Sequence, residues 1–145
     1  MSMCSISEDD REFLDKFEKC TLSGKCWTHE AHIRMAWLRM EQSDSFEEAL
    51  DRIRSGIKAF NSSVQSVGYH ETITVAFARV IHSKRRLSKG SSNWQAFLEE
   101  NEVLLSKNCL LEFYSAELLK SDEARHFFVE PDLKPLPQIL ESGRI

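Results

Sequence analysis

Three histidines are the residues of this 145-residue chain best suited to chemistry. His29 and His32 are three positions apart, so on a helix their side chains share one face within a single turn. His70 falls in the first turn of another predicted helix, again on its apolar face. Three imidazoles around an open fourth position are a known arrangement for zinc or another divalent transition metal such as iron. We therefore name His29, His32 and His70 as candidate metal ligands, provided that their helices border one pocket.

Two other interpretations of these histidines stay open. A helix N-terminus carries partial positive charge and favours an anion over a cation. With Arg34 or Arg125 nearby, the same imidazoles could hold the carboxylate or phosphate of a small anionic or polar ligand. Alternatively, the histidines are structural, and they cap helices or donate to backbone carbonyls.

Glu71 follows His70 and can either ligate a metal or orient an imidazole by accepting its hydrogen bond. Imidazole titrates near neutral pH, so the histidines can also transfer protons. An arginine such as Arg125 can bind an anionic group of a substrate. We name Glu71 as a candidate catalytic residue of a small helical enzyme. The alternative is a non-catalytic binding or interaction module with structural histidines.

Common catalytic motifs do not fit the sequence. His29-Glu30-Ala31-His32 is one residue short of the H-E-x-x-H zinc-protease motif, and Glu30 falls on the polar side of its helix. No C-x-x-C pair, phosphate-binding loop or dinucleotide fingerprint is present.

Two longer stretches carry a resemblance. Residues 27–34 read W-T-H-E-A-H-I-R and resemble a W-T-H-x-A-H-L-R signature, with Ile33 in place of a leucine. Residues 68–74 read G-Y-H-E-T-I-T and resemble a G-Y-H-E-T-x-T signature. A C-terminal pattern adds Tyr114-Ser115, Ser121, Ala124-Arg125 and Pro131-Asp132-Leu133. Together, these signatures are similar to those of a family of small uncharacterised bacterial proteins. The resemblance covers nearly the whole chain.

The resemblance implies no activity, but it implies which positions belong together. They are His29, His32, Arg34, Tyr69, His70, Glu71, Thr72, Tyr114, Ser115 and Arg125. Tyr69, Tyr114 and Arg125 enter this group by resemblance alone, and a structural hydrogen-bond network is the alternative account of them. On this resemblance we add Arg125 and Tyr69 to Glu71 as candidate catalytic residues.

Helical periodicity and capping residues predict the elements that must position these side chains. The predicted helices cover 7–19, 29–42, 45–60, 69–87, 94–105 and 108–120, with a short one after Ser121. Thr28 should cap the second helix, in which Glu30 can pair with Arg34 one turn on. That helix is apolar over most of its circumference, which is typical of a central, buried helix.

The predicted fold is all-α: a compact single-domain bundle of about six helices over residues 1–128. All three prolines lie between 131 and 137, so residues 129–145 should form an extended C-terminal tail packed on the bundle or trailing from it. No useful period-2 alternation of apolar residues predicts a strand.

Composition limits the partners. The net charge of −4 argues against general affinity for nucleic acid. No apolar run approaches the roughly 20 residues of a membrane span, and the polar, acidic start of the chain lacks the pattern of a secretory signal. We therefore expect a cytoplasmic protein without membrane contact. The sequence leaves its oligomeric state open.

Overall fold

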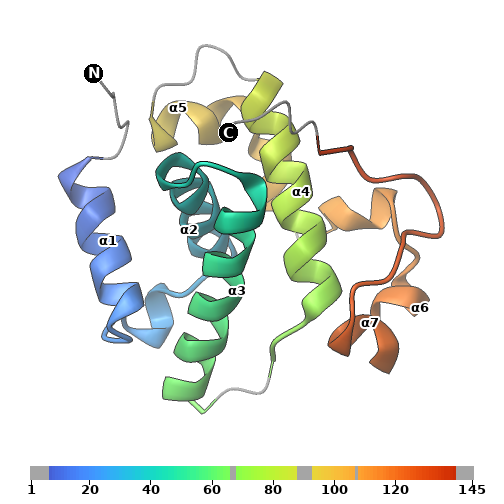
Figure 1. The fold of residues 1–145 in the computed structure, drawn as a ribbon, viewed down its shortest axis with the longest axis horizontal. Helices are drawn as coiled ribbons and strands as arrows, with labels where there is room; N and C mark the ends of the chain where they lie inside the picture. The colour runs from blue at the N-terminus through green and yellow to red at the C-terminus, as the bar shows by residue number, and fades with distance from the viewer. Residues whose placement is uncertain (1–6, 66–67, 88–92, 107, 140–145) are drawn as a thin grey trace.

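The computed structural model describes residues 7–65, 68–87, 93–106 and 108–139. The predicted all-α class is confirmed: the described residues contain helices and no strand (Figure 1). The elements are α1 (Glu8–Glu18), η1 (Gly24–Cys26), α2 (His29–Gln42), α3 (Phe46–Ser63), α4 (Glu71–Leu87), α5 (Trp94–Glu100), η2 (Glu102–Leu105), η3 (Cys109–Glu112), α6 (Ala116–Leu119) and α7 (Asp122–His126). Over the described residues, no helix combines the length and apolarity that a membrane span needs.

Side-chain caps fix where the first helices begin. Ser7 accepts the backbone N–H of Asp10, whose carboxylate accepts the N–H of Ser7 in return, so α1 opens with a reciprocal capping box. Thr28 caps α2 through the N–H of Ala31, as predicted. The sequence interpretation ended the third helix at Phe60, but α3 continues to Ser63 because neither glycine nor proline interrupts it there.

Helix α2 is the centre of the bundle, as its apolar circumference predicted. It packs against both α3 and α4, while α1 lies on the far side of α3 from α4 (Figure 1). Eight of its fourteen residues are buried, and they include the fully buried Trp37. On α4, the side chains of Ala78 and Ile81 are buried in the same core.

The predicted pair between Glu30 and Arg34 is wrong. Arg34 instead reaches back to α1, where its guanidinium lies 2.7 Å from the carboxylate of Asp10 and 4.5 Å above the ring of Phe13. Asp10 is buried and Arg34 half-buried, so this pair gains more than an exposed i, i+4 pair and ties α1 to α2.

The predicted helix over 108–120 is also wrong, because it is divided into η3 and α6. The first piece ends at Glu112, and Ser115 caps the second by accepting the N–H of Leu118. Asp132 holds Ser115 in that position through the serine N–H at 2.8 Å and hydroxyl at 2.7 Å. In the same way, the predicted helix over 94–105 is divided between α5 and η2.

Thr72 anchors the segment that follows α7. Its buried hydroxyl donates to the carbonyl of Phe127 at 2.7 Å and accepts the N–H of Val129 at 3.1 Å. The hydroxyl of Tyr114 donates to the carbonyl of Val129, and Arg79 of α4 donates to the carbonyl of Pro137. Residues 129–139 thus run across the bundle without a helix of their own.

Thr72→Val keeps the shape of the buried side chain but removes both hydrogen bonds to this segment. We expect a loss of about 1–3 kcal/mol in the free energy of unfolding, because two backbone groups lose their partner. Amide hydrogen exchange at Val129 should become faster at the same time. Thr21→Val, at an exposed threonine, is the control. Unchanged exchange at Val129 would contradict the anchoring role.

Candidate functional site

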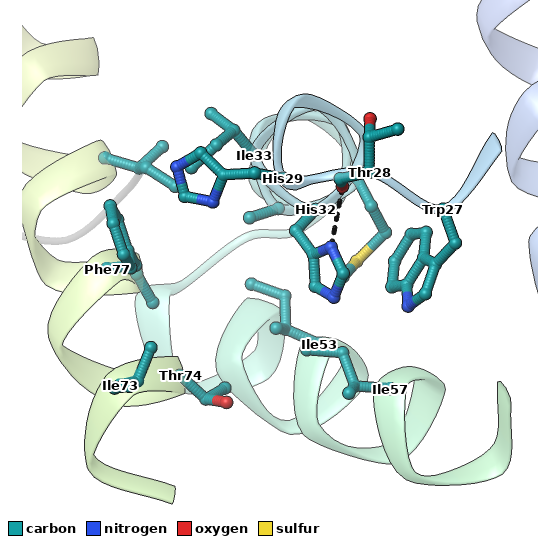
Figure 2. Close-up of a pocket in the computed structure, with 14 residues that line it drawn as sticks. Trp27, Thr28, His29, His32, Ile33, Ile53, Ile57, Ile73, Thr74 and Phe77 are labelled. Atoms are coloured by element: carbon teal, nitrogen blue, oxygen red, sulfur yellow. Dashed lines mark hydrogen bonds between the residues drawn. The ribbon is translucent and has the colours of Figure 1, made fainter. Parts of the chain in front are cut away.

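A cavity of about 400 Å³ lies between α2, α3 and α4 (Figure 2). Its wall is mostly apolar. The apolar lining residues are Trp27, Ile33, Met35, Ala36, Ile53, Ile57, Ile73, Phe77, Ala78 and Ile81. Thr28, His29, His32 and Thr74 supply its polar groups, and no lining residue is an aspartate, glutamate, lysine or arginine. The volume falls in the range of about 300–1,000 Å³ typical of small-molecule sites.

His29 stands at the start of α2 with its ring held on two sides. Its Nε2 lies 2.9 Å from the carbonyl oxygen of Leu104, and its ring meets Phe77 edge-on at 5.2 Å between centroids. A carbonyl can only accept, so Nε2 carries the hydrogen, and Nδ1 is left as an acceptor in the neutral ring.

His32 follows one turn later, and its tautomer is fixed by the backbone. Its Nδ1 donates to the carbonyl of Thr28 at 2.8 Å, which leaves Nε2 as the acceptor. The ring lies against that of Trp27, tilted by 31°, with 3.9 Å between centroids. Burial lowers the pKa of His32 below 6.5, and the neighbouring His29 lowers it further, against the opposing effect of the Thr28 carbonyl. His32 is therefore neutral at pH 7.

The two imidazoles give the cavity one polar end. Figure 2 shows both rings projecting from α2 into the cavity, His29 toward Phe77 and His32 over Ile53. In the part of the chain that the structure describes, Nδ1 of His29 and Nε2 of His32 have no hydrogen-bond partner. A neutral imidazole nitrogen of this kind can accept a hydrogen bond or take up a proton. The arrangement is suited to a hydrogen-bond donor on an apolar body.

The predicted constellation of three histidines is not formed, because His70 lies outside this cavity. Its Nδ1 caps α4 by accepting the N–H of Ile73 at 3.1 Å, and its Nε2 donates to the carbonyl of Leu119 at 2.7 Å. Both ring nitrogens are occupied, so His70 matches the structural interpretation of the sequence. The sequence placed His70 in the first turn of this helix, but α4 begins at Glu71. The ring of His70 faces α6 rather than α2.

A metal site of three protein ligands has no counterpart in the described residues, where no group of three or more His, Cys, Asp or Glu side chains could hold an ion. His29 and His32 offer two nitrogen ligands at the cavity, one fewer than the three that catalytic zinc sites typically use. The metal interpretation therefore lacks its third ligand there.

Glu71 and Tyr69 lie together, but they form a link between α3 and α4 rather than part of the cavity. The carboxylate of Glu71 accepts the hydroxyl of Tyr69 at 2.5 Å and pairs with Arg54 of α3 at 2.8 Å. Burial and the hydrogen bond to Glu71 raise the pKa of Tyr69 to about 12, so its hydroxyl stays protonated. Both candidate catalytic groups thus have structural partners.

The pair between Glu71 and Arg54 makes stability depend on pH. Burial alone would raise the pKa of Glu71, but the hydrogen bonds from Arg54 and Tyr69 outweigh it and lower the pKa below 4.5. A carboxyl group whose pKa is lower in the folded state contributes stability above its unfolded pKa, and this is lost as the pH falls through the folded value.

Glu71→Gln should therefore remove part of the decline in stability that the protein shows below about pH 4.5. Denaturant unfolding at pH 7, 4.5 and 3 measures this difference, with Glu47→Gln, an exposed glutamate of α3, as the control. Parallel pH profiles of the Glu71→Gln variant and the unaltered protein would contradict the pairing.

Arg125, the third candidate catalytic residue, is exposed on α7. With His70 and Lys120 it borders a separate recess of about 590 Å³ beside α6 and α7. The structure therefore divides the six candidate residues among three places. His29 and His32 share the cavity, Tyr69 and Glu71 link α3 to α4, and His70 and Arg125 border the recess.

The other positions grouped by the resemblance serve the fold. Thr72, Tyr114 and Ser115 all hold the segment after α7 through hydrogen bonds. Sequence reasoning missed the apolar wall as a site, to which Trp27, Ile53 and Phe77 belong. The available signal was that His29 and His32 continue the same helix face as apolar residues.

Comparisons with family models, with curated proteins and with solved structures found no match to this chain. Its interpretation therefore rests on the geometry of the cavity.

Proposed function

We propose that the cavity between α2, α3 and α4 binds a small, neutral and mostly apolar organic molecule that carries a hydrogen-bond donor such as a hydroxyl or amine group. One observation carries the proposal: two imidazole nitrogens without a partner, on His29 and His32, face an otherwise apolar cavity of about 400 Å³. A neutral imidazole nitrogen is a hydrogen-bond acceptor, and a ligand donor can supply its hydrogen bond in place of water.

The chemistry of the lining disfavours the other ligands that the sequence left open. An anion would meet two acceptor nitrogens and no cationic side chain at this cavity. A donor group on an apolar body satisfies the nitrogens, while Ile53, Phe77 and their neighbours remove its apolar surface from water. The proposal makes the chain a binding protein and assigns it no reaction.

Matched probes test this preference. 2-Naphthol, naphthalene and 2-naphthoate share one ring system but carry a donor, no polar group and a carboxylate, respectively. Isothermal titration calorimetry at pH 7.5 should give the tightest binding for 2-naphthol, about fivefold tighter than naphthalene. 2-Naphthoate should bind weakest. Equal affinities for 2-naphthol and naphthalene would refute the role of the imidazoles.

The His32→Phe variant tests how much Nε2 of His32 contributes to the preference for 2-naphthol over naphthalene. Phenylalanine keeps a ring against Trp27, and the carbonyl of Thr28 keeps the backbone N–H of residue 32 as a partner. The variant should lose part of the preference for 2-naphthol over naphthalene, because Nδ1 of His29 remains as an acceptor. In the unaltered protein, 2-naphthol binding should weaken as the pH falls below 6.5 through the pKa of His32, because the protonated ring no longer accepts.

A further inference from the structure

Arg39 is a buried cation whose hydrogen-bond donors are only partly used. Its side chain is only 5% exposed. Gln42 accepts from Nη1 at 3.1 Å, and the carboxylate of Glu18 lies 3.7 Å from Nη2. Nε is buried and has no hydrogen-bond partner in the described residues. The chain therefore does not use all the donors of this guanidinium, although buried donors are nearly always paired.

A second arginine makes the imbalance larger. Arg52 of α3 lies close enough for its charge to act on Arg39, and no described carboxylate is within 4 Å of it. Burial, and then this like charge, lower the pKa of the Arg39 guanidinium. Glu18 is the carboxylate that offsets them, and its side chain is 67% exposed. Two cations thus face one loosely held anion.

Both arginines border one recess of about 250 Å³ where α1 crosses α3. Its other lining residues are Phe17, Glu18, Ser55, Gly56 and Ala59. The hydroxyl of Ser55 adds a neutral donor at the same place. Guanidinium groups bind the oxygens of phosphates and carboxylates through paired, charge-assisted hydrogen bonds.

We propose that this recess binds a small oxyanion, a phosphate or carboxylate group, between Arg39 and Arg52. The site is separate from the apolar cavity, whose lining residues do not include any of these side chains. Arg52 pairs with the anion, Ser55 donates a further hydrogen bond, and Arg39 supplies the buried positive charge that holds the anion in the recess.

NMR titration of the full chain tests the site through its own atoms. The probes are sodium phosphate and sodium acetate, each matched by sodium chloride of equal ionic strength. Phosphate or acetate should shift the Nε–H cross-peaks of Arg39 and Arg52 along a saturable curve, and the same anion should raise the thermal midpoint. Saturation by acetate alone assigns the site to carboxylates, and saturation by phosphate to phosphate groups.

Arg52→Gln is the decisive variant, because Arg52 is only half-buried whereas Arg39 is part of the core. It should weaken anion binding by about tenfold or more. Arg86→Gln, at an exposed arginine of α4, should leave binding unchanged. The proposal is overturned if neither anion gives a saturable shift beyond that of chloride, or if Arg52→Gln binds as tightly as the unaltered protein.

Discussion

Replacing Phe17 by alanine is expected to lower the free energy of unfolding by about 3–5 kcal/mol. The ring is 1% exposed and stacks on Trp27 at 4.7 Å and on Phe60 at 5.7 Å between centroids. Removing the ring leaves a cavity between α1, Trp27 and α3 that the surrounding side chains cannot easily fill. Urea unfolding followed by tryptophan fluorescence measures the loss. Phe127→Ala, at a ring that is 66% exposed, should change stability by about 0.5 kcal/mol or less.

Gly56→Ala tests the same packing. Helix propensity alone would make this substitution stabilising, whereas the contact with Phe17 should make it destabilising. A β-carbon at Gly56 would lie 2.7 Å from Cε2 of Phe17, so the bare backbone of α3 lets this ring approach. Alanine in a helix interior normally gains about 0.5–1 kcal/mol over glycine. Gly56→Ala should nevertheless destabilise the protein, and it should become stabilising in the Phe17→Ala background. A stabilising effect in both backgrounds would contradict the contact.

Filling the cavity should abolish binding of apolar ligands. Ala78 of α4 lines the cavity and is 1% exposed, so Ala78→Phe places a ring in the volume that we assign to the ligand. We expect 2-naphthol binding to weaken by about a hundredfold or more, since a blocked pocket loses most of its buried apolar contact. Overpacking should cost about 1–3 kcal/mol of stability.

Calorimetry on the folded variant separates these effects, with Ala116→Phe on the exposed side of α6 as the control. The control should bind 2-naphthol like the unaltered protein. If the Ala78→Phe variant is folded and binds 2-naphthol normally, the ligand lies elsewhere and the proposed cavity is wrong.

The elements that local signals determine could be predicted from the sequence. Thr28 as a cap and the apolar circumference of residues 29–42 gave the bounds and the central place of α2. The same local pattern put His29 and His32 on one face, and they do share the cavity. Four consecutive turns of helix with a clear cap carry enough information for this, because each contact involved is within one helix.

The parts that depend on distant partners could not be predicted. His70 binds the carbonyl of Leu119, which is 49 positions away, and helical spacing says nothing about that carbonyl. Arg34 has Glu30 within reach on its own helix, yet it pairs with Asp10 of α1. Asp132 likewise interrupts a predicted helix by holding Ser115. The family resemblance stays a prediction, and its grouped positions mostly hold the fold together.

The state of one atom tests the central claim most directly. The ¹⁵N chemical shift of Nε2 of His32 distinguishes a bare acceptor nitrogen from one that accepts a hydrogen bond or carries a proton. At pH 7.5 the structure predicts a bare acceptor in the free protein, because Nδ1 donates to the carbonyl of Thr28. Saturating 2-naphthol should shift Nε2 toward the hydrogen-bonded value, and naphthalene should not. An Nε2 that already carries the proton, or that does not respond to bound 2-naphthol, would contradict the account.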